Sequence, residues 1–69
     1  MIEDKTLGKG KYRITIIFRD EIIVERFETE FIAMKTVNNM KILFPNIFIG
    51  GAIEKKDKSW RVIWTLGNN

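Results

Sequence analysis

The chain contains no cysteine and no histidine, and only one proline. Without cysteine it cannot form disulfide bonds, and without either residue it cannot build a nitrogen- or sulfur-ligated metal site. The same absences remove the cysteine nucleophile and histidine, the usual general acid–base of enzymes. The single serine, Ser59, adjoins a predicted turn and has no candidate base. We therefore expect a protein that is not an enzyme, with no catalytic residue, cofactor, metal or small-molecule substrate.

Long apolar runs are also missing, since no stretch approaches the ~20 residues that span a bilayer. The first five residues, Met1 to Lys5, lack the basic-then-apolar order of a signal peptide. These features predict a cytoplasmic protein without a membrane partner. Isoleucine, lysine and asparagine are frequent, as in AT-rich coding sequences, which suits a small accessory protein of a bacterium or mobile element.

The composition is nevertheless that of a folded protein, with 45% hydrophobic and 30% charged residues. A chain of 69 residues holds one domain and buries only about 60% of its unfolded surface. Self-association would add burial that so small a core lacks. The net charge of +3 is a mild basic bias, which serves solubility or attracts an acidic partner.

Residues 1–10 show no apolar periodicity and are predicted to be a flexible tail, so that residues 11–69 form the domain. From Tyr12 to Phe18 apolar and polar residues alternate with the period of a strand. Asp20 and Glu21 then separate this segment from a second apolar segment, 22–27. The pattern predicts a hairpin with a four-residue loop at 19–22.

The periodicity then changes to that of a helix over residues 30–43. Thr29 is a suitable N-cap, and Glu30 lies in the first turn, where the helix dipole favours a carboxylate. Pro45 disfavours helical geometry at the preceding residue and ends the helix. The apolar stripe that would face a core is Ala33, Val37, Met40 and Phe44, with Leu43 on its flank.

Segments 46–54 and 59–66 predict a second hairpin around Asp57. The expected pairing sets Glu54 opposite Arg61, and Gly51 opposite Trp64, whose ring would cover the bare backbone. Gly50 and Gly51 lie within a strand pattern and do not lead into a helix, so they do not form a phosphate-binding loop.

The order ββαββ predicts an α+β fold with one helix packed on a four-stranded mixed sheet. We expect sheet order 2-1-4-3, with the first and last strands central and parallel. From Lys11 to Leu66 the order and lengths of the elements resemble the β-grasp immunoglobulin-binding domains of the protein G type. The resemblance implies the fold alone. The helix is expected to cover Ile14, Ile16, Phe18, Ile49, Ile53, Val62, Trp64 and Leu66.

The opposite face of this sheet would carry all four arginines among β-branched residues. The candidate partner-binding residues are Arg13, Thr15, Ile17, Arg19, Val24, Arg26, Arg61 and Ile63, with Ile22 and Thr65 beside them. Interfaces are enriched in arginine around an apolar centre. The pattern therefore favours a module that binds a protein partner or a second copy, through this face or an unpaired edge strand.

Two other interpretations remain open. The face can be an ordinary solvated surface, in which Arg13–Glu28 and Arg61–Glu54 form weak cross-strand pairs. It can also bind nucleic acid, with the lysine-bearing tail extending the basic surface. Single-strand platforms present aromatic rings to the bases. We expect Tyr12, Phe18, Trp60 and Trp64 to be buried and mainly Phe48 to lie outside, so nucleic acid ranks below protein.

Overall fold

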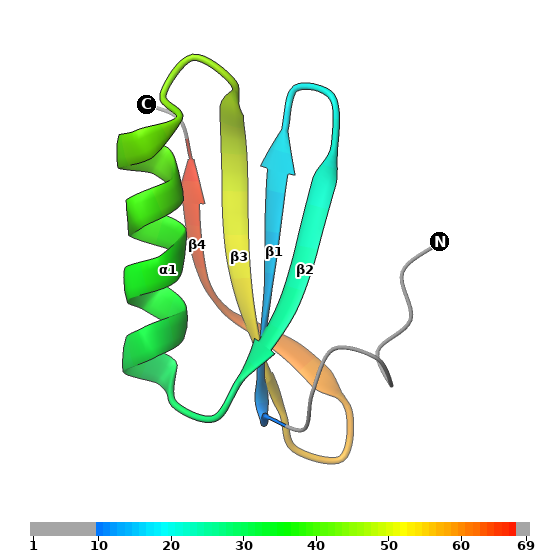
Figure 1. Cartoon of the computed structure of the whole chain (residues 1–69). Coiled ribbons are helices and arrows are strands. Elements are labelled where there is room, and N and C mark those ends of the chain that lie inside the picture. The colour runs from blue at the N-terminus through cyan, green and yellow to red at the C-terminus, as the bar shows by residue number, and fades with distance from the viewer. Residues whose placement is uncertain (1–9, 68–69) are drawn as a thin grey trace.

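The computed structural model describes residues 10–67 and has one helix against one face of a four-stranded antiparallel sheet (Figure 1). The predicted tail lies outside the described residues, apart from Gly10. The ββαββ order is confirmed. The elements are β1 (Tyr12–Phe18), β2 (Ile22–Phe27), α1 (Glu30–Leu43), β3 (Phe48–Lys56) and β4 (Trp60–Gly67).

Helix α1 has the predicted bounds because its two ends carry the expected signals. The Thr29 hydroxyl accepts a hydrogen bond from the Ile32 backbone N–H at 3.3 Å, which satisfies one of the free donors of the first turn. Glu30 lies in that turn. At the other end the Phe44 N–H donates to the Met40 carbonyl, and Pro45 follows. The helix therefore begins and ends for local reasons.

The strand order is β2-β1-β3-β4, so the predicted order 2-1-4-3 with a parallel central pair is wrong. β1 pairs antiparallel with β3, and Ile14 lies opposite Ile53. A side chain on Gly51 would begin only 2.6 Å from Val37 Cγ1 of the helix. The glycine allows α1 to approach β3 closely, and β4 takes the edge position. The β-grasp arrangement implied by the resemblance therefore does not apply.

The first hairpin keeps the predicted faces but not the predicted register. Arg13 lies opposite Arg26 and not Glu28, because the loop is shorter than the predicted four residues 19–22 and Ile22 already pairs with Ile17. The Phe18 N–H donates to the Glu21 carbonyl at 2.8 Å and closes the turn. A shift of two residues along a strand preserves which side chains face the core.

The core lies between α1 and the sheet. Its buried members are Ile14, Ile16, Phe18, Ala33, Val37, Phe48 and Ile53. A register shift between Ile17 and Phe18 sets Phe48 opposite Phe18, so Phe48 is only 1% exposed. Ile49 consequently faces outward at 51% exposure. The predictions that Phe48 lies outside and Ile49 inside are both wrong, and this irregularity is the reason.

A second irregularity, between Ile53 and Glu54, affects the placement of β4. Ile53 pairs with Trp64 and Glu54 with Val62, which leaves Ile63 as the extra residue of a bulge. Val62 thus points outward with 54% exposure, contrary to prediction. Gly51 lies opposite Leu66, so the expected covering of this glycine by Trp64 is also wrong.

Candidate binding face

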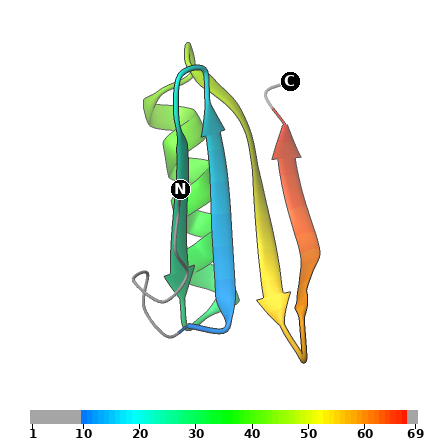
Figure 2. The ribbon, with the colours of Figure 1, turned by 90° about the vertical axis from the view of Figure 1, so that its right-hand side faces the viewer.

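The outer face is the sheet surface turned away from α1. In Figure 2 the helix lies behind β1 and β2, so the outer face is turned toward the viewer there. Cross-strand pairing arranges its side chains in rows. One row is Ile22–Ile17–Gly50; the next is Val24–Thr15–Ala52–Thr65; the third is Arg26–Arg13–Glu54–Val62. The face is therefore apolar near the β1–β2 turn, low in relief at its centre, and charged at the far end.

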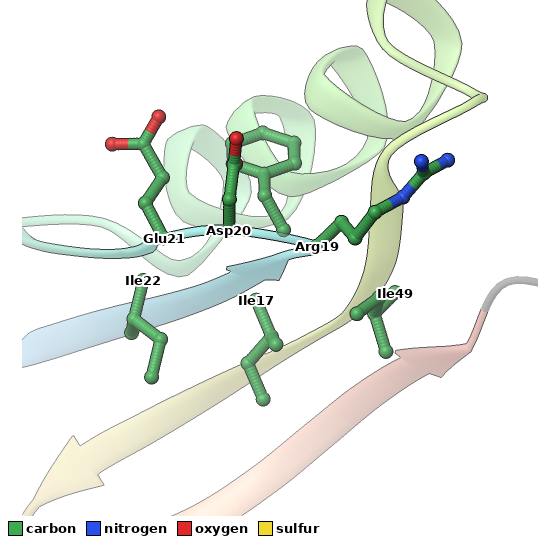
Figure 3. Close-up of a pocket in the computed structure, with 7 residues that line it drawn as sticks. Ile17, Arg19, Asp20, Glu21, Ile22 and Ile49 are labelled. Atoms are coloured by element: carbon green, nitrogen blue, oxygen red, sulfur yellow. The ribbon is translucent and has the colours of Figure 1, made fainter.

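Ile17, Ile22 and Ile49, called here the isoleucine patch, form the apolar part of this face. They come from three strands and point to the same side of the sheet (Figure 3). Their exposed fractions are 40%, 55% and 51%. They line an open hollow of about 550 Å³ together with Phe18 and the turn residues. Three large side chains are thus left uncovered at adjacent positions.

The turn beside the patch is polar and held in place by hydrogen bonds. The Arg19 backbone N–H donates to the Ile47 carbonyl at 2.8 Å, and its guanidinium donates to the Asn46 carbonyl at 2.9 Å. Asp20 and Glu21 point to the side opposite the isoleucines (Figure 3). Arg19 therefore links the β1–β2 turn to the loop before β3, and this polar turn borders the patch.

The charged end contains an ion pair between two adjacent strands. Arg13 Nε donates to Glu54 Oε1 at 2.9 Å, and its terminal nitrogen lies 2.8 Å from the same oxygen. Both side chains are about one-fifth exposed. Glu54 was predicted to pair with Arg61, but the bulge in β4 sets Val62 opposite Glu54. The pair neutralises one of the two arginines in this row.

Trp60 lies half-buried at the same end, among cations. The guanidinium carbons of Arg13 and Arg26 are 4.4 and 5.0 Å from its ring centroid, and Lys56 Nζ is 5.7 Å away. Arg26 Nε also donates to the Gly10 carbonyl at 3.0 Å. Such cation–π contacts stabilise the ring and the arginines together. The prediction that Trp60 is buried in the core is therefore wrong.

Five predicted residues share the outer face, namely Arg13, Thr15, Ile17, Val24 and Arg26. Arg61 and Ile63 do not join them, because Arg61 pairs with Lys55 on the helix side and Ile63 packs against the core. The predicted gathering of all four arginines on one face is wrong.

Sequence reasoning missed Ile49, Val62 and Trp60 as members of this face. Ile49 and Val62 lie next to register shifts, and Trp60 lies two residues before Val62, so that its face too depends on the bulge in β4. The one available signal was the glycine pair 50–51, which is typical of irregular strands.

A second hollow, of about 290 Å³, lies between the end of α1 and the β1–β2 turn. Its lining is Phe18, Glu21, Ile23, Met40, Phe44 and Ile47. Within residues 10–67 no three potential acidic metal ligands gather. Helix α1, with 14 residues, is shorter than a membrane span. Glu21 is the single ionisable group of this lining, which offers no pair of groups for acid–base chemistry.

Comparison of the chain with protein families, with curated proteins and with solved structures finds no match. The geometry of the outer face and of the sheet edges is therefore the basis on which function is argued.

Proposed function

We propose that the chain is a non-catalytic module that binds a protein partner through the isoleucine patch. The observation that carries this proposal is the exposure of Ile17, Ile22 and Ile49 at adjacent positions of three strands. Protein interfaces have such an apolar centre within a polar border, here supplied by the turn at 19–21. The fold leaves these side chains uncovered while it buries their neighbours on the same strands.

The arginines support a protein partner over a nucleic acid. Arg13 is paired with Glu54, and Arg26 is engaged by the Gly10 carbonyl and the Trp60 ring. These contacts hold the guanidinium groups against the protein and reduce their capacity to neutralise phosphates. The apolar end is therefore the better contact surface.

Glutamate at position 22 is expected to remove partner binding, because a charge at the centre of an apolar contact stays unpaired when water is excluded. Ile22 lies on an edge strand and is already 55% exposed, so Ile22→Glu should fold normally. The measurement is quantitative affinity capture from the native host with wild type and variant, each checked by circular dichroism. We expect retention of a specific protein to fall about tenfold or more.

Ile42→Glu is the matched control, since Ile42 is 72% exposed on the side of α1 that faces away from the sheet and from the isoleucine patch. It should capture the same partner as wild type, with or without nuclease treatment. Equal capture by wild type and Ile22→Glu, or loss of the partner on nuclease treatment, would contradict the proposal.

A second candidate function, binding of single-stranded nucleic acid, is favoured by one observation. Trp60 lies among Arg13, Arg26 and Lys56 on an open sheet, and this combination of ring and cations suits a stacked base and its phosphate. Binding would require the arginines to leave the ring. This candidate therefore ranks second.

Titration with a single-stranded oligonucleotide at two salt concentrations tests this candidate. If it holds, tryptophan fluorescence should be quenched, affinity should fall as salt rises, and Trp60→Leu should weaken binding by about tenfold. Trp64→Leu is the control for the second indole, which packs against the core. Quenching that persists unchanged in Trp60→Leu would eliminate this candidate.

A further inference from the structure

The sheet has two edge strands, β2 and β4, whose outward backbone groups have no partner strand within the described fold. β1 is antiparallel to both β2 and β3, and β3 is antiparallel to β4. β2 and β4 therefore run in opposite directions. A second copy, placed beside the first in the same orientation, would set its β2 antiparallel to β4 and continue the sheet with every helix on one side.

The charges of the two edges are complementary in that arrangement. The C-terminal end of β2 carries Glu25, with Glu28 just beyond it, and both are exposed. The N-terminal end of β4 carries Arg61, with Lys58 in the preceding turn, and both are exposed. Antiparallel pairing of β2 with β4 brings these two ends together.

Glu25 and Arg61 also lie on the same side of the sheet. Glu25 is opposite the buried Ile14, and Arg61 is opposite Lys55, which pairs in turn with Tyr12. Both positions belong to the helix side. Across a β2–β4 junction between two copies the carboxylate and the guanidinium can therefore meet. Arg26 faces the other way and is held by Gly10 and Trp60 of its own chain.

The apolar surfaces on the helix side are complementary as well. Helix α1 packs on β1, β2 and β3, and lies away from the β4 edge (Figure 2). Trp64 and Leu66 of β4 are only half-buried. Lys41 donates to the Gly67 carbonyl at 2.9 Å, so its flank of the helix faces β4. Ile32 and Leu43 occupy the opposite flank, toward β2, and are 50% and 65% exposed. In the next copy this flank would lie beside the uncovered part of β4.

Pairing of like edges fits less well. Two β4 strands in antiparallel register would set Arg61 beside the Gly67 end of the other copy, where β4 has no carboxylate. Two β2 strands would set Glu25 near Asp20 and Glu21 of the other copy, and like charges repel. The matched ends therefore favour a head-to-tail contact.

We propose that the β4 edge binds the β2 edge of a second copy, head to tail, and that the chain assembles into rows with a continuous antiparallel sheet. This contact is heterologous, because it joins two different surfaces of the chain. Each added copy leaves one free β2 edge and one free β4 edge, so copies can be added until the row closes into a ring. The contact uses the sheet edges and does not depend on the isoleucine patch. Ile22 itself lies on the β2 edge, so the two proposals are distinguished by Thr65→Pro, described below, which blocks the β4 edge and leaves all three side chains of the isoleucine patch in place.

Charge reversal tests the contact on the full chain by sedimentation velocity at varied concentration. Wild type should show a mass that rises past two copies. Arg61→Glu and Glu25→Lys should each raise the concentration needed for assembly by about tenfold or more. The chain that carries both changes should recover assembly, because the charges are exchanged across the same contact. A wild type that stays monomeric at the highest soluble concentration, or a double variant without recovery, would overturn the proposal.

Proline variants test the direction of assembly. The Phe18 N–H bonds to Glu21, so alternation turns the Val24 N–H toward the free edge of β2. The Lys56 N–H donates to the Lys11 carbonyl on the β1 side, and by alternation the backbone groups of Ala52 also point toward β1. Ala52 therefore makes no backbone hydrogen bond to Thr65, which lies opposite it on β4. The Thr65 N–H consequently points to the free edge of β4. Val24→Pro and Thr65→Pro thus block one edge each and remove no internal ladder bond.

Each proline variant alone should be monomeric, and an equimolar mixture should form a complex of one copy of each, which cannot grow further. Circular dichroism of each variant confirms folding, and the charge variants test the same contact should a proline variant unfold. A stable dimer of either proline variant alone would show that like edges pair, and would overturn the head-to-tail contact.

Discussion

Replacing Phe48 with alanine is expected to lower the free energy of unfolding by about 3–5 kcal/mol, the usual cost of deleting a buried phenyl ring. Phe48 is 1% exposed, and its ring packs edge-on against Phe18 with centroids 6.3 Å apart. Phe18 in turn contacts the Phe44 ring at 5.8 Å. The substitution therefore opens a cavity between the sheet and the end of the helix.

A domain of this length has a stability of roughly 3–10 kcal/mol, so Phe48→Ala should be partly or largely unfolded at room temperature. Urea denaturation followed by circular dichroism measures the change, and Phe48→Leu provides a milder variant whose transition stays measurable. Ile49→Ala is the matched neighbour and should change stability by less than about 1 kcal/mol, because Ile49 faces outward. The reverse ranking of Phe48 and Ile49 would contradict the register of β3.

Gly51→Ala is expected to destabilise the fold by about 1–3 kcal/mol, although alanine is better than glycine in most strands. The added Cβ would lie 2.6 Å from Val37 Cγ1, and Val37 is fully buried in α1. Neither partner can move without separating the helix from β3. Thermal or urea unfolding, compared with wild type, measures the loss.

A double-mutant cycle isolates the cause of this loss. Val37→Ala removes the methyl groups that Gly51→Ala would contact, so the two changes together should cost less than the sum of their separate costs. The expected coupling is about 1 kcal/mol in favour of the double variant. Additive costs would show that the helix does not rest on Gly51. Gly50→Ala is the control, since its nearest neighbour would be 3.5 Å away.

Local sequence signals predicted the elements well because they act over a few residues. The alternation from Tyr12 to Phe18 predicted a strand with Ile14, Ile16 and Phe18 inward, and all three are buried. The cap at Thr29 and the break at Pro45 predicted the bounds of α1. These patterns need no knowledge of what each element packs against.

The bulges were beyond such reasoning. Val62, Ile63 and Trp64 are three consecutive apolar residues, so hydrophobicity alone does not locate the extra residue. In the structure Ile63 is that residue, and Val62 and Trp64 face opposite sides of the sheet. The strain and hydrogen bonding of two paired strands decide where a ladder shifts. For that reason Arg61 and Trp60 changed faces relative to prediction, and with them much of the basic part of the candidate site.

The strand order was also undetermined by local patterns. Both β3 and β4 are apolar enough to occupy a central position, and either is reachable from the helix. The choice depends on contacts between residues far apart in the sequence, chiefly the close packing of Val37 on Gly51. A resemblance in element order and length did not include this contact, so it implied a different sheet.

The pairing of β1 with β3 has a kinetic consequence. Each hairpin joins neighbouring segments, whereas the Arg13–Glu54 bond links residues 41 positions apart. The two hairpins and α1 can each begin to form early from short-range contacts, but the central ladder must close a long loop before its bonds compensate the lost chain entropy. Folding of this chain should accordingly be limited by the docking of its two halves, and a chain released from a ribosome completes its sheet only after the last strands have emerged.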